Sequence, residues 1–301
     1  MLTNKHILIL GGDARQIEII DKLNALDAHL SLVGFDQLNQ NFVGAIKVNM
    51  DEIRPSDVDS IILPVSGTDD EGHVEATFSS QTIKLTKEWL GETPQYCTIY
   101  SGISTPYLDQ VSLEAGREVV KLFERDDVAI YNSIPTVEGS IMMVIQHTDI
   151  TIHGANVIIL GLGRTGLSLV RAFSALGASV KVGVRRPEHL ARAFEMGVES
   201  FYIKDLASQV QDAEICINTI PAMVLTSQVL SHMPASSFIL DVASLPGGTD
   251  FRYAKKRGIK AIITPGLPGL VAPKTAGRII ANVLSELLLE KFSEEEKRND
   301  D

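Results

Sequence analysis

A glycine-rich turn at residues 161–166 constrains this chain more than any other feature, because of what flanks it. The apolar run Val157–Leu160 ends at the first glycine, and an amphipathic segment over 167–176 follows. Residues 179–184 then form a second strand-like segment. Strand, glycine turn, helix and strand in this order are typical of a dinucleotide site, in which backbone N–H groups approach a pyrophosphate. The residues of the turn that we expect to bind the cofactor are Gly161, Leu162, Gly163, Arg164, Thr165 and Gly166.

The end of the second strand predicts which dinucleotide is bound. NAD sites usually carry Asp or Glu there, hydrogen-bonded to the ribose 2′-hydroxyl. Here the residues after Val184 are Arg185, Arg186 and Pro187, and none of them is a carboxylate. Guanidinium groups suit a 2′-phosphate, which they bind through paired N–H donors. The sequence therefore favours NADP over NAD; the alternative is that both arginines belong to a solvated loop.

Composition narrows the class of protein. A length of 301 residues favours two domains, and a hydrophobic content of 45% supports sizeable cores. Apolar runs are short and interrupted, so we expect no transmembrane helix, and the N-terminus lacks a signal-peptide pattern. The net charge of −11 argues against nucleic acid and anionic membranes as partners. The two cysteines lie in strand-like runs, so we expect buried reduced thiols in a cytosolic protein. The seven histidines are scattered, so we expect no metal site.

Strand-like and helix-like segments alternate along the chain, which predicts an α/β fold with parallel sheets. The second half has the six candidate strands that a Rossmann domain requires, at 157–160, 179–184, 200–203, 214–220, 238–243 and 261–264. In the first half we expect strands at 7–10, 30–35, 60–65, 96–100 and 128–131, and helices at 17–26 and 108–122. The predicted architecture is two Rossmann-like lobes with a cleft between them.

Two helices are expected to connect the lobes. Pro135 and the residues after it have the chemistry of a helix start. A later helix begins near Pro273, and its apolar stripe, which includes Leu284 and Leu288, predicts that it returns to the first lobe. The expected domains are residues 1–134 together with helix 273–292, a connecting helix at 135–150, an NADP-binding domain at 151–272, and a disordered tail at 293–301.

Ligands of open α/β sheets bind beyond the carboxyl ends of the strands, so those ends hold further candidate site residues. In the second half, the residues expected to line the cofactor are Asn218, Thr219, Ile220, Pro221, Asp241 and Ala243. Asp241 has the alternative role of holding a neighbouring loop. In the first half, Ser66 and Ser101 suit a substrate carboxylate through their hydroxyls, although helix capping is the other common use of such serines.

Charged residues near these ends are candidates for substrate binding and proton transfer. Arg15 follows a glycine turn at 11–12 that lacks the dinucleotide spacing and carries Asp13, whose charge would repel a phosphate. Lys274 begins the returning helix, where it would neutralise a carboxylate or act as an acid or base. For Arg15 and for Lys274, a surface position with no role in substrate binding is an equal alternative. Glu138 suits helix capping better than proton abstraction.

Five segments together resemble the A subunit of bacterial dipicolinate synthase. They are GGDARQ at 11–16, FERDD at 123–127, YNSIPTVEG at 131–139, GLGRTG at 161–166 and PGLPGLVAPKTAG at 265–277. The resemblance covers almost the whole chain, and the segments at 131–139 and 265–277 are the most distinctive. It implies a dehydrogenase of spore-forming bacteria that oxidises dihydrodipicolinate, or the hydroxylated precursor that loses water to give it, to pyridine-2,6-dicarboxylate.

The resemblance also implies partners and site residues. The family works with a second, flavoprotein-like subunit in the mother-cell cytosol during sporulation, and we expect a homo-oligomer. Because the substrate is a dianion, its expected contacts are Arg15, Arg125 and Lys274, assisted by Ser66 and Ser101. The candidate catalytic residues are Lys274, Ser101 and Glu138.

Two other classes remain open from the sequence. A 2-hydroxyacid, alanine or shikimate-type dehydrogenase shares the two-lobed plan. Hydroxyacid dehydrogenases of that plan use a histidine near the end of the nucleotide domain, however, and no histidine follows His232. The second alternative is an NADP-binding regulatory protein that does not turn over.

Overall fold

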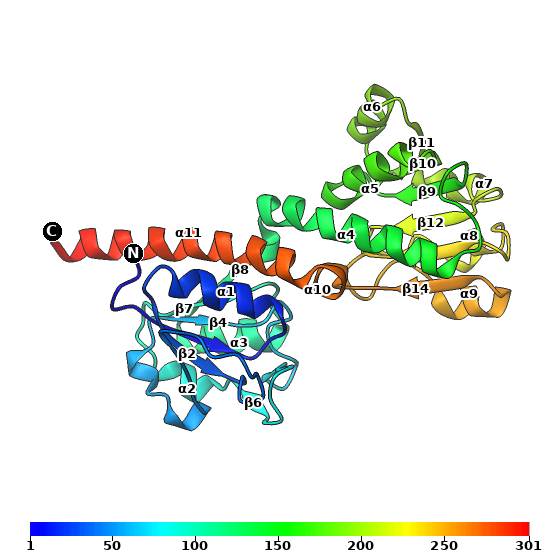
Figure 1. Cartoon of the computed structure of the whole chain (residues 1–301). Helices are drawn as coiled ribbons and strands as arrows, with labels where there is room; N and C mark the ends of the chain where they lie inside the picture. The colour runs from blue at the N-terminus through cyan, green and yellow to red at the C-terminus, as the bar shows by residue number, and fades with distance from the viewer. Residues whose placement is uncertain (301) are drawn as a thin grey trace. The chain divides into compact units, whose positions relative to one another are not determined.

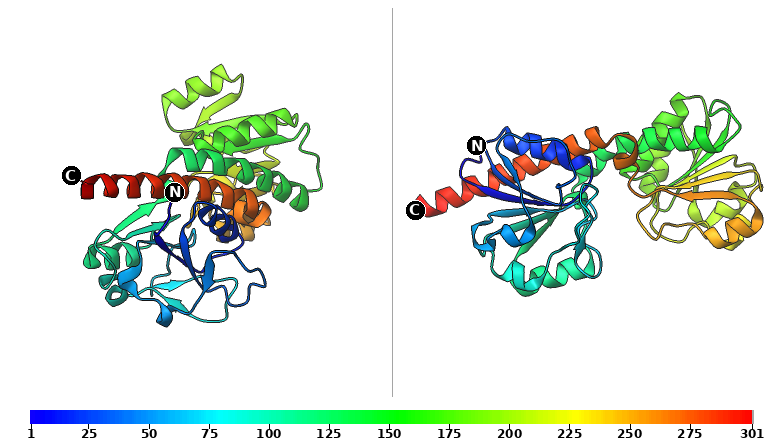
Figure 2. Two further views of the ribbon diagram at one scale, coloured as in Figure 1. Left: turned by 60° about the vertical axis from the view of Figure 1, so that its left-hand side comes forward. Right: turned by 60° about the horizontal axis from the view of Figure 1, so that its bottom comes forward.

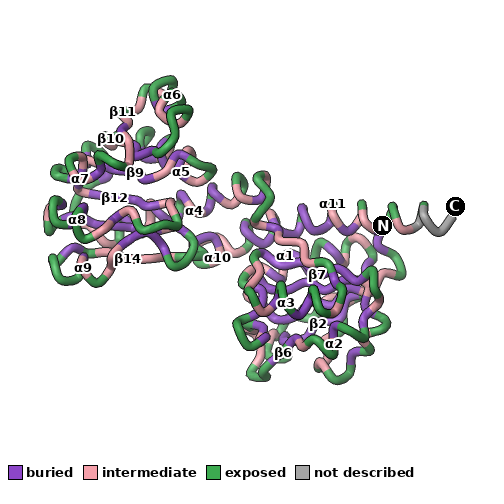
Figure 3. The backbone as a smooth tube through the Cα atoms, turned by 180° about the vertical axis from the view of Figure 1, so that it is seen from behind, coloured by how far each residue is buried: buried purple, intermediate pink, exposed green. Residues whose placement is uncertain are grey.

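The computed structural model describes residues 1–300 and divides them into two compact units, each built around a six-stranded parallel sheet. Unit 1 comprises residues 1–128 and the chain from residue 272 onward, and unit 2 comprises Ala129–Val271. Figure 3 shows that the central strands of each sheet are buried inside their own unit. The expectation of two α/β lobes is confirmed, while the cleft between them stays a prediction.

The sheet of unit 2 is the one that the sequence predicts. Its strands lie in the order β11-β10-β9-β12-β13-β14, the order of a doubly wound dinucleotide-binding fold. The strands are β9 (Asn156–Leu160), β10 (Ser179–Val184), β11 (Glu199–Tyr202), β12 (Ile215–Asn218), β13 (Phe238–Asp241) and β14 (Lys260–Ile263). All six predicted strands are confirmed. Their apolar runs are continuous because helices cover both faces of the sheet.

Two sets of helices sandwich this sheet (Figure 1). Residues of α4 (Asp126–His147), α5 (Arg164–Ala175) and α6 (Pro187–Glu195) share one core cluster with Val157 and Ile159. The opposite cluster contains Ile158 and Leu160, together with residues from α7 (Leu206–Gln209), α8 (Ser227–Leu230) and α9 (Phe251–Arg257). The alternation of side chains along β9 therefore supplies both cores.

Unit 1 repeats the same strand order with different strands. Its sheet runs β3-β2-β1-β4-β7-β8, formed by β1 (His6–Leu10), β2 (His29–Val33), β3 (Ala45–Lys47), β4 (Ser60–Ile62), β7 (Thr98–Ser101) and β8 (Glu118–Lys121). The sixth strand is β8, so the strand predicted at 128–131 is wrong and that segment is helical. The helix predicted over 108–122 ends at Ala115, because Gly116 adopts the left-handed conformation that terminates α3 (Pro106–Ala115). Val119 and Val120 then favour a strand through their branched side chains.

A short hairpin, β5 (His73–Val74) with β6 (Ile83–Lys84), covers the carboxyl end of β1. The backbone N–H of Gly12 donates to the carbonyl of Glu75 at 2.6 Å, and the N–H of Thr77 donates back to the carbonyl of Gly12 at 2.9 Å. Phe78 stacks on Phe35, with ring centroids 6.2 Å apart. The hairpin therefore occupies the place where a dinucleotide-binding lobe exposes its glycine turn.

Helix α4 begins earlier than the connecting helix predicted at 135–150. It starts at Asp126 and contains Pro135 in its interior. The start is stabilised by two acidic residues in the first turn, of which Asp127 accepts a hydrogen bond from the N–H of Val128 at 2.9 Å. By length and composition α4 is the one helix among residues 1–300 able to cross a membrane. Core helices meet the same criterion, and Val137 and Val144 of α4 are buried in unit 2.

Helix α11 (Pro273–Asp300) belongs to unit 1 and packs against α1 (Arg15–Asn24) (Figure 2). Its stripe of Ile280, Leu284 and Leu288 is buried in the core of unit 1. The helix does not stop at 292: residues 293–300, predicted as part of a disordered tail, continue it. That segment contains no glycine or proline, and Lys291 pairs with Glu295 one turn later at 3.9 Å. Residue 301 lies outside the described residues.

Both cysteines are free and buried, Cys97 in unit 1 and Cys216 in unit 2. Burial raises the pKa of Cys97 to about 11 and that of Cys216 to about 12. Both thiols are therefore protonated at neutral pH, and the sequence prediction of buried reduced thiols is confirmed.

Candidate functional site

The glycine turn between β9 and α5 has the geometry that a pyrophosphate requires. Gly161 has a φ of 97°, and a Cβ there would lie 2.4 Å from Oγ1 of Thr219. A Cβ on Gly166 would lie 2.1 Å from the carbonyl oxygen of Gly161, so only glycine allows α5 to pack so closely on the turn. At Gly163 a Cβ would meet no atom within 4 Å. The first and third glycines are thus needed for packing, and the second faces open space.

Helix α5 begins at this open space without a side-chain cap. Gly163 is its N-cap residue, and it offers no side chain to accept a hydrogen bond from the first turn. The first N–H groups of a helix have no partner within the helix, and the helix dipole is positive at this end. The turn therefore presents free donors and a positive potential to an anion, which is what a pyrophosphate needs. The residues present fit a dinucleotide cofactor.

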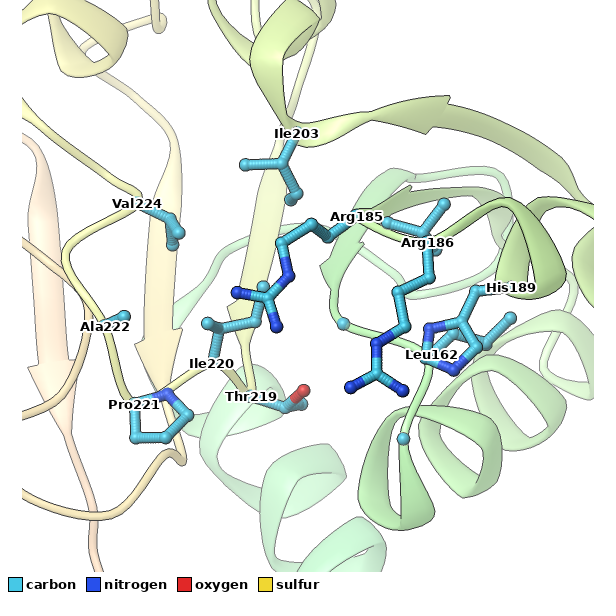
Figure 4. A pocket seen from close by; sticks show the side chains of 13 residues that line it. Leu162, Arg185, Arg186, His189, Ile203, Thr219, Ile220, Pro221, Ala222 and Val224 are labelled. Carbon is cyan, nitrogen blue, oxygen red and sulfur yellow. The ribbon is translucent and has the colours of Figure 1, made fainter.

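A pocket of about 520 Å³ opens beside this turn. Its polar side is formed by Arg185, Arg186 and His189, and no Asp or Glu belongs to the lining. Its other walls are mainly apolar, with Ile203, Ile220 and Val224 among them. Figure 4 shows the two guanidinium groups and the imidazole pointing into the pocket. The pocket thus combines an apolar slot for a flat ring with a group of cations for an anion.

Both arginines reach this pocket because of how β10 ends. Val184 is buried at the last position of the strand, and Arg186 is the N-cap residue of α6. The two arginine side chains follow the carboxyl end of the strand, next to the glycine turn that follows β9. Arg186 has one nearby carboxylate, that of Glu188, at 3.7 Å with both side chains largely exposed. Solvent weakens such a pair, so the guanidinium remains available to a ligand.

The residues after β12 divide into pocket walls and a supporting network. Thr219, Ile220 and Pro221 line the pocket, and their contact with a cofactor stays a prediction. Asn218 is fully buried, and its amide holds the turn by donating to the carbonyl of Ile220 at 3.0 Å and accepting from the N–H of Ile220 at 3.1 Å. It also donates to Asp241 at 3.0 Å. Asn218 therefore shapes the pocket from beneath.

Asp241 is fully buried at the end of β13, and internal partners occupy its carboxylate. Oδ1 accepts hydrogen bonds from Asn218 at 3.0 Å and from the N–H of Ala243 at 3.2 Å. Oδ2 accepts from the N–H of Gly248 at 2.8 Å and from the hydroxyl of Thr249 at 2.7 Å. Asp241 thus fastens the loop over 243–249 and, like Ala243, does not line the pocket. This arrangement matches the alternative role that the sequence left open for Asp241.

The glycine turn of unit 1 has a different use. A Cβ on Gly11 would lie 2.4 Å from the carbonyl oxygen of Glu75, so the hairpin fills the space beside this turn. Asp13 accepts hydrogen bonds from the guanidinium of Arg15 at 2.7–3.1 Å. Burial alone would raise the pKa of Asp13, but the hydrogen bonds and charge of Arg15 outweigh it and hold the pKa below its usual value. Arg15 is therefore already neutralised by an ionised carboxylate.

The other substrate-binding candidates occupy varied surroundings in unit 1. Ser101 is fully buried, and its hydroxyl is within hydrogen-bonding distance of the carbonyl oxygens of Ile103 at 2.6 Å and Pro64 at 3.2 Å. Ser66 is exposed and donates to Glu75 at 3.5 Å. Arg125 is paired with Asp127 at 2.8 Å. Ser101 therefore acts as a structural hydroxyl, whereas Ser66 faces solvent.

Lys274 and Glu138 are both exposed. The Lys274 side chain is 69% exposed near the start of α11, with Nζ 3.9 Å from Oε1 of Glu18. The same Glu18 accepts a hydrogen bond from Arg278 at 2.8 Å. Glu138 lies in the middle of α4 and is exposed, so the favoured prediction that it caps a helix start is wrong. The error follows from placing the helix start at Pro135 instead of Asp126.

The sequence missed five residues of the pocket, namely Val184, His189, Ile203, Ala222 and Val224. Val184 directly precedes Arg185, whereas Ile203, Ala222 and Val224 come from segments whose closeness to the turn depends on the sheet order. A signal for His189 was present, because it follows Arg186 by three residues, within the first turn of a helix.

Comparison with known proteins places these features in a class. Residues 131–300 match the family described as alanine dehydrogenase/PNT, C-terminal domain, and residues 6–123 match the N-terminal domain of the dipicolinate synthase A subunit. The Rossmann-type unit and its pocket define an oxidoreductase of the dehydrogenase type that binds a nicotinamide cofactor. The chain is 59% identical over 297 residues to the dipicolinate synthase A subunit of Bacillus subtilis (strain 168), covering 99% of this chain and 100% of that protein. The chain belongs to the family of dipicolinate synthase A subunits.

Solved structures agree with this assignment. Crystal structures of the dipicolinate synthase A subunit from Bacillus halodurans and from Bacillus subtilis are 60% and 58% identical and superpose with a TM-score of 0.93 each. They cover 96% and 98% of this chain, and each is itself covered to 99%. The transhydrogenase of Sinorhizobium meliloti, at 15% identity and a TM-score of 0.68, shares the fold, with 94% of both chains covered.

Proposed function

We propose that this chain oxidises dihydrodipicolinate, or its hydroxylated tetrahydro precursor, to dipicolinate with NADP as the oxidant, as the A subunit of a dipicolinate synthase. The single observation that carries the choice of cofactor is the pair Arg185 and Arg186 in a pocket whose lining has no carboxylate. Membership of the A-subunit family supports the choice of reaction. A role in sporulation, in the mother-cell cytosol, belongs to the same proposal.

The preference for NADP follows from charge in the pocket. An Asp or Glu at the end of β10 would accept hydrogen bonds from ribose hydroxyls and would repel a 2′-phosphate. Arg185 and Arg186 instead offer donors to that phosphate. A charge-assisted hydrogen bond contributes about 1.5–3 kcal/mol, which corresponds to roughly tenfold or more in affinity. The apolar walls at Ile203, Ile220 and Val224 suit the adenine ring.

The cofactor, when bound, supplies the hydride acceptor at C4 of its nicotinamide ring. Dihydrodipicolinate loses one hydride and one proton, and the products are dipicolinate, NADPH and a proton. The chain must therefore orient the substrate and receive a ring proton at a side chain or a positioned water. Because the product is aromatic, the reaction is strongly downhill, and the step requires little acid–base assistance.

Among the candidates for binding the dianionic substrate, Lys274 has the least local compensation by hydrogen bonds. Arg15 is held by Asp13 and Arg125 by Asp127, whereas Nζ of Lys274 is 3.9 Å from the nearest carboxylate oxygen. We assign Lys274 the role of neutralising a substrate carboxylate, with Ser66 as a further contact, because Arg15 and Arg125 are already paired with Asp13 and Asp127. Ser101 supports the loop at 102–103 through its buried hydroxyl. A second, flavoprotein-like subunit completes the proposed assembly, in which this chain also self-associates.

The test is a coupled assay with the purified chain. Fresh product of the aspartate-semialdehyde–pyruvate condensation is supplied with NADP or with NAD, and reduced cofactor and dipicolinate are measured together. We expect equal formation of both products, faster with NADP. The role of Lys274 is tested with Lys274→Ala. This variant is expected to raise KM for the substrate at least tenfold while leaving NADP affinity unchanged.

Three other outcomes would change the proposal in different ways. Turnover only after addition of the second subunit would make this chain one part of a shared catalyst. Faster turnover with NAD would overturn the cofactor assignment alone. Tight NADP binding without turnover under either condition would contradict the enzymatic role and favour a regulatory one.

A further inference from the structure

The pocket contains a third ionisable side chain beside the two arginines. His189 lines it together with Arg185 and Arg186 and lies in the first turn of α6. The backbone N–H of His189 donates to the carbonyl of Arg186 at 3.1 Å, so the turn is closed on itself. Side chains in a helix tilt toward its N-terminus, which directs the imidazole back over the β10–α6 loop. Figure 4 shows the ring and the guanidinium of Arg186 pointing into the same pocket, whose lining also includes Leu162.

The imidazole of His189 has both nitrogens available. Among residues 1–300, none forms a hydrogen bond or an ion pair with this ring. Three other histidines have ring partners: His6 with Ser31 at 2.8 Å, His73 with Asp69 at 3.0 Å, and His232 with the carbonyl of Gln228 at 2.9 Å. His189 differs from the remaining histidines because it lines the pocket. A ring that lines a pocket with two free nitrogens is placed to bind a ligand and contributes little to internal packing.

The charge around the ring favours an anion as that ligand. No carboxylate belongs to the pocket lining, although the whole chain carries a net charge of −11. A cationic imidazole would be repelled by both neighbouring guanidinium groups, and a phosphate placed between them would remove that repulsion. The same phosphate could accept hydrogen bonds from all three side chains.

We propose that His189 is a specificity-determining residue that donates to the 2′-phosphate of the cofactor together with Arg186. This inference rests on the proposed use of NADP and adds a third donor to the two guanidinium groups at the phosphate.

The experiment measures binding of two cofactor fragments to the full chain by isothermal titration calorimetry. Adenosine 2′,5′-bisphosphate carries the 2′-phosphate, and AMP lacks it. The variants are His189→Ala, His189→Arg and, as a matched control in the same unit, His232→Ala. AMP binding reports whether the pocket of each variant is intact.

We expect His189→Ala to bind the bisphosphate about tenfold more weakly than the unmodified chain, with AMP affinity unchanged. His189→Arg should restore the affinity for the bisphosphate. Unchanged bisphosphate affinity of His189→Ala, or an equal loss for AMP, would overturn the role of His189. An unmodified chain that binds the bisphosphate no better than AMP would instead contradict the proposed use of NADP, and this inference with it.

Discussion

Cofactor choice depends on a few side chains at one strand end. Arg185 and Arg186 occupy the position where a carboxylate would select NAD, and the structure places both in the pocket. Asp241 is a carboxylate at the end of another strand of the same sheet, but its two oxygens are engaged by Asn218 and by the loop that it holds. The two arginines can therefore still form hydrogen bonds with a ligand, whereas Asp241 cannot.

At this scale we predict that Arg185→Ala lowers the preference for NADP over NAD by about tenfold, because one charge-assisted contact to the 2′-phosphate is lost. The ratio of kcat/KM values, or of Kd values if the chain needs its partner for turnover, measures this change. Arg192→Ala is the matched control, since Arg192 lies on α6 but pairs with Glu195 at 2.8 Å and does not line the pocket. An unchanged ratio in Arg185→Ala would mean that the arginine is a solvated loop residue.

At the scale of elements, the most consequential contact is that of α11 with α1. The long C-terminal helix completes the core of unit 1, where Leu284 and Leu288 are fully buried beside Ile19, Ile20 and Leu23 of α1. The two helices approach closely at one glycine. A Cβ on Gly277 would lie 2.5 Å from the carbonyl oxygen of Arg15 and 3.0 Å from its Cα, both of them backbone atoms.

We predict that Gly277→Ala destabilises unit 1 by about 1–3 kcal/mol, because the helices must move apart to admit one methyl group. In an uncrowded helix the same change would stabilise by up to about 1 kcal/mol. Gly91→Ala in α2 (Lys87–Gly91) is the matched control, since a Cβ there meets no atom within 4 Å. Chemical denaturation followed by circular dichroism gives the difference. Equal effects of the two substitutions would show that α11 adapts to the added methyl group without cost.

At the scale of the whole molecule, two units of the same strand order have different uses. Both sheets place a glycine turn after the first strand, but in unit 1 the hairpin at 73–84 fills the space beside that turn. In unit 2 the corresponding space is open at Gly163. One fold thus provides a cofactor site in one unit and a covered surface in the other.

We therefore predict that NADP alone slows backbone hydrogen exchange mainly in unit 2, at residues 161–166, 185–189 and 219–224, because these segments line the pocket. Mass spectrometry of peptides from the exchanged chain measures it, with NAD at the same concentration as the comparison. Protection of residues 11–16 as strong as that of residues 161–166 would contradict the assignment of a single dinucleotide site.

Most of this fold was predictable because its strands are buried on both faces and separated by helices with clear apolar stripes. The six strands of unit 2 follow from runs such as Val157–Leu160, and the return of α11 follows from its stripe. The errors lie where local signals compete. Gly116 ends a helix whose apolar pattern continues into β8, and Pro135 lies inside a helix although proline usually marks a helix start.

The sequence by itself determined the dinucleotide turn, the arginines after β10 and the two α/β units, because each of these depends on residues that are neighbours in the chain. Only the tertiary structure decided which side chains remain available to a ligand. The polar groups of Ser101 and Asp241 form buried hydrogen bonds, and Arg15 is paired with Asp13. The first glycine turn is covered by a hairpin more than fifty residues away in the chain. His189 is left free in the pocket by the same packing. The physical reason is that hydrogen-bonding capacity is settled by contacts between distant segments, which local periodicity does not encode.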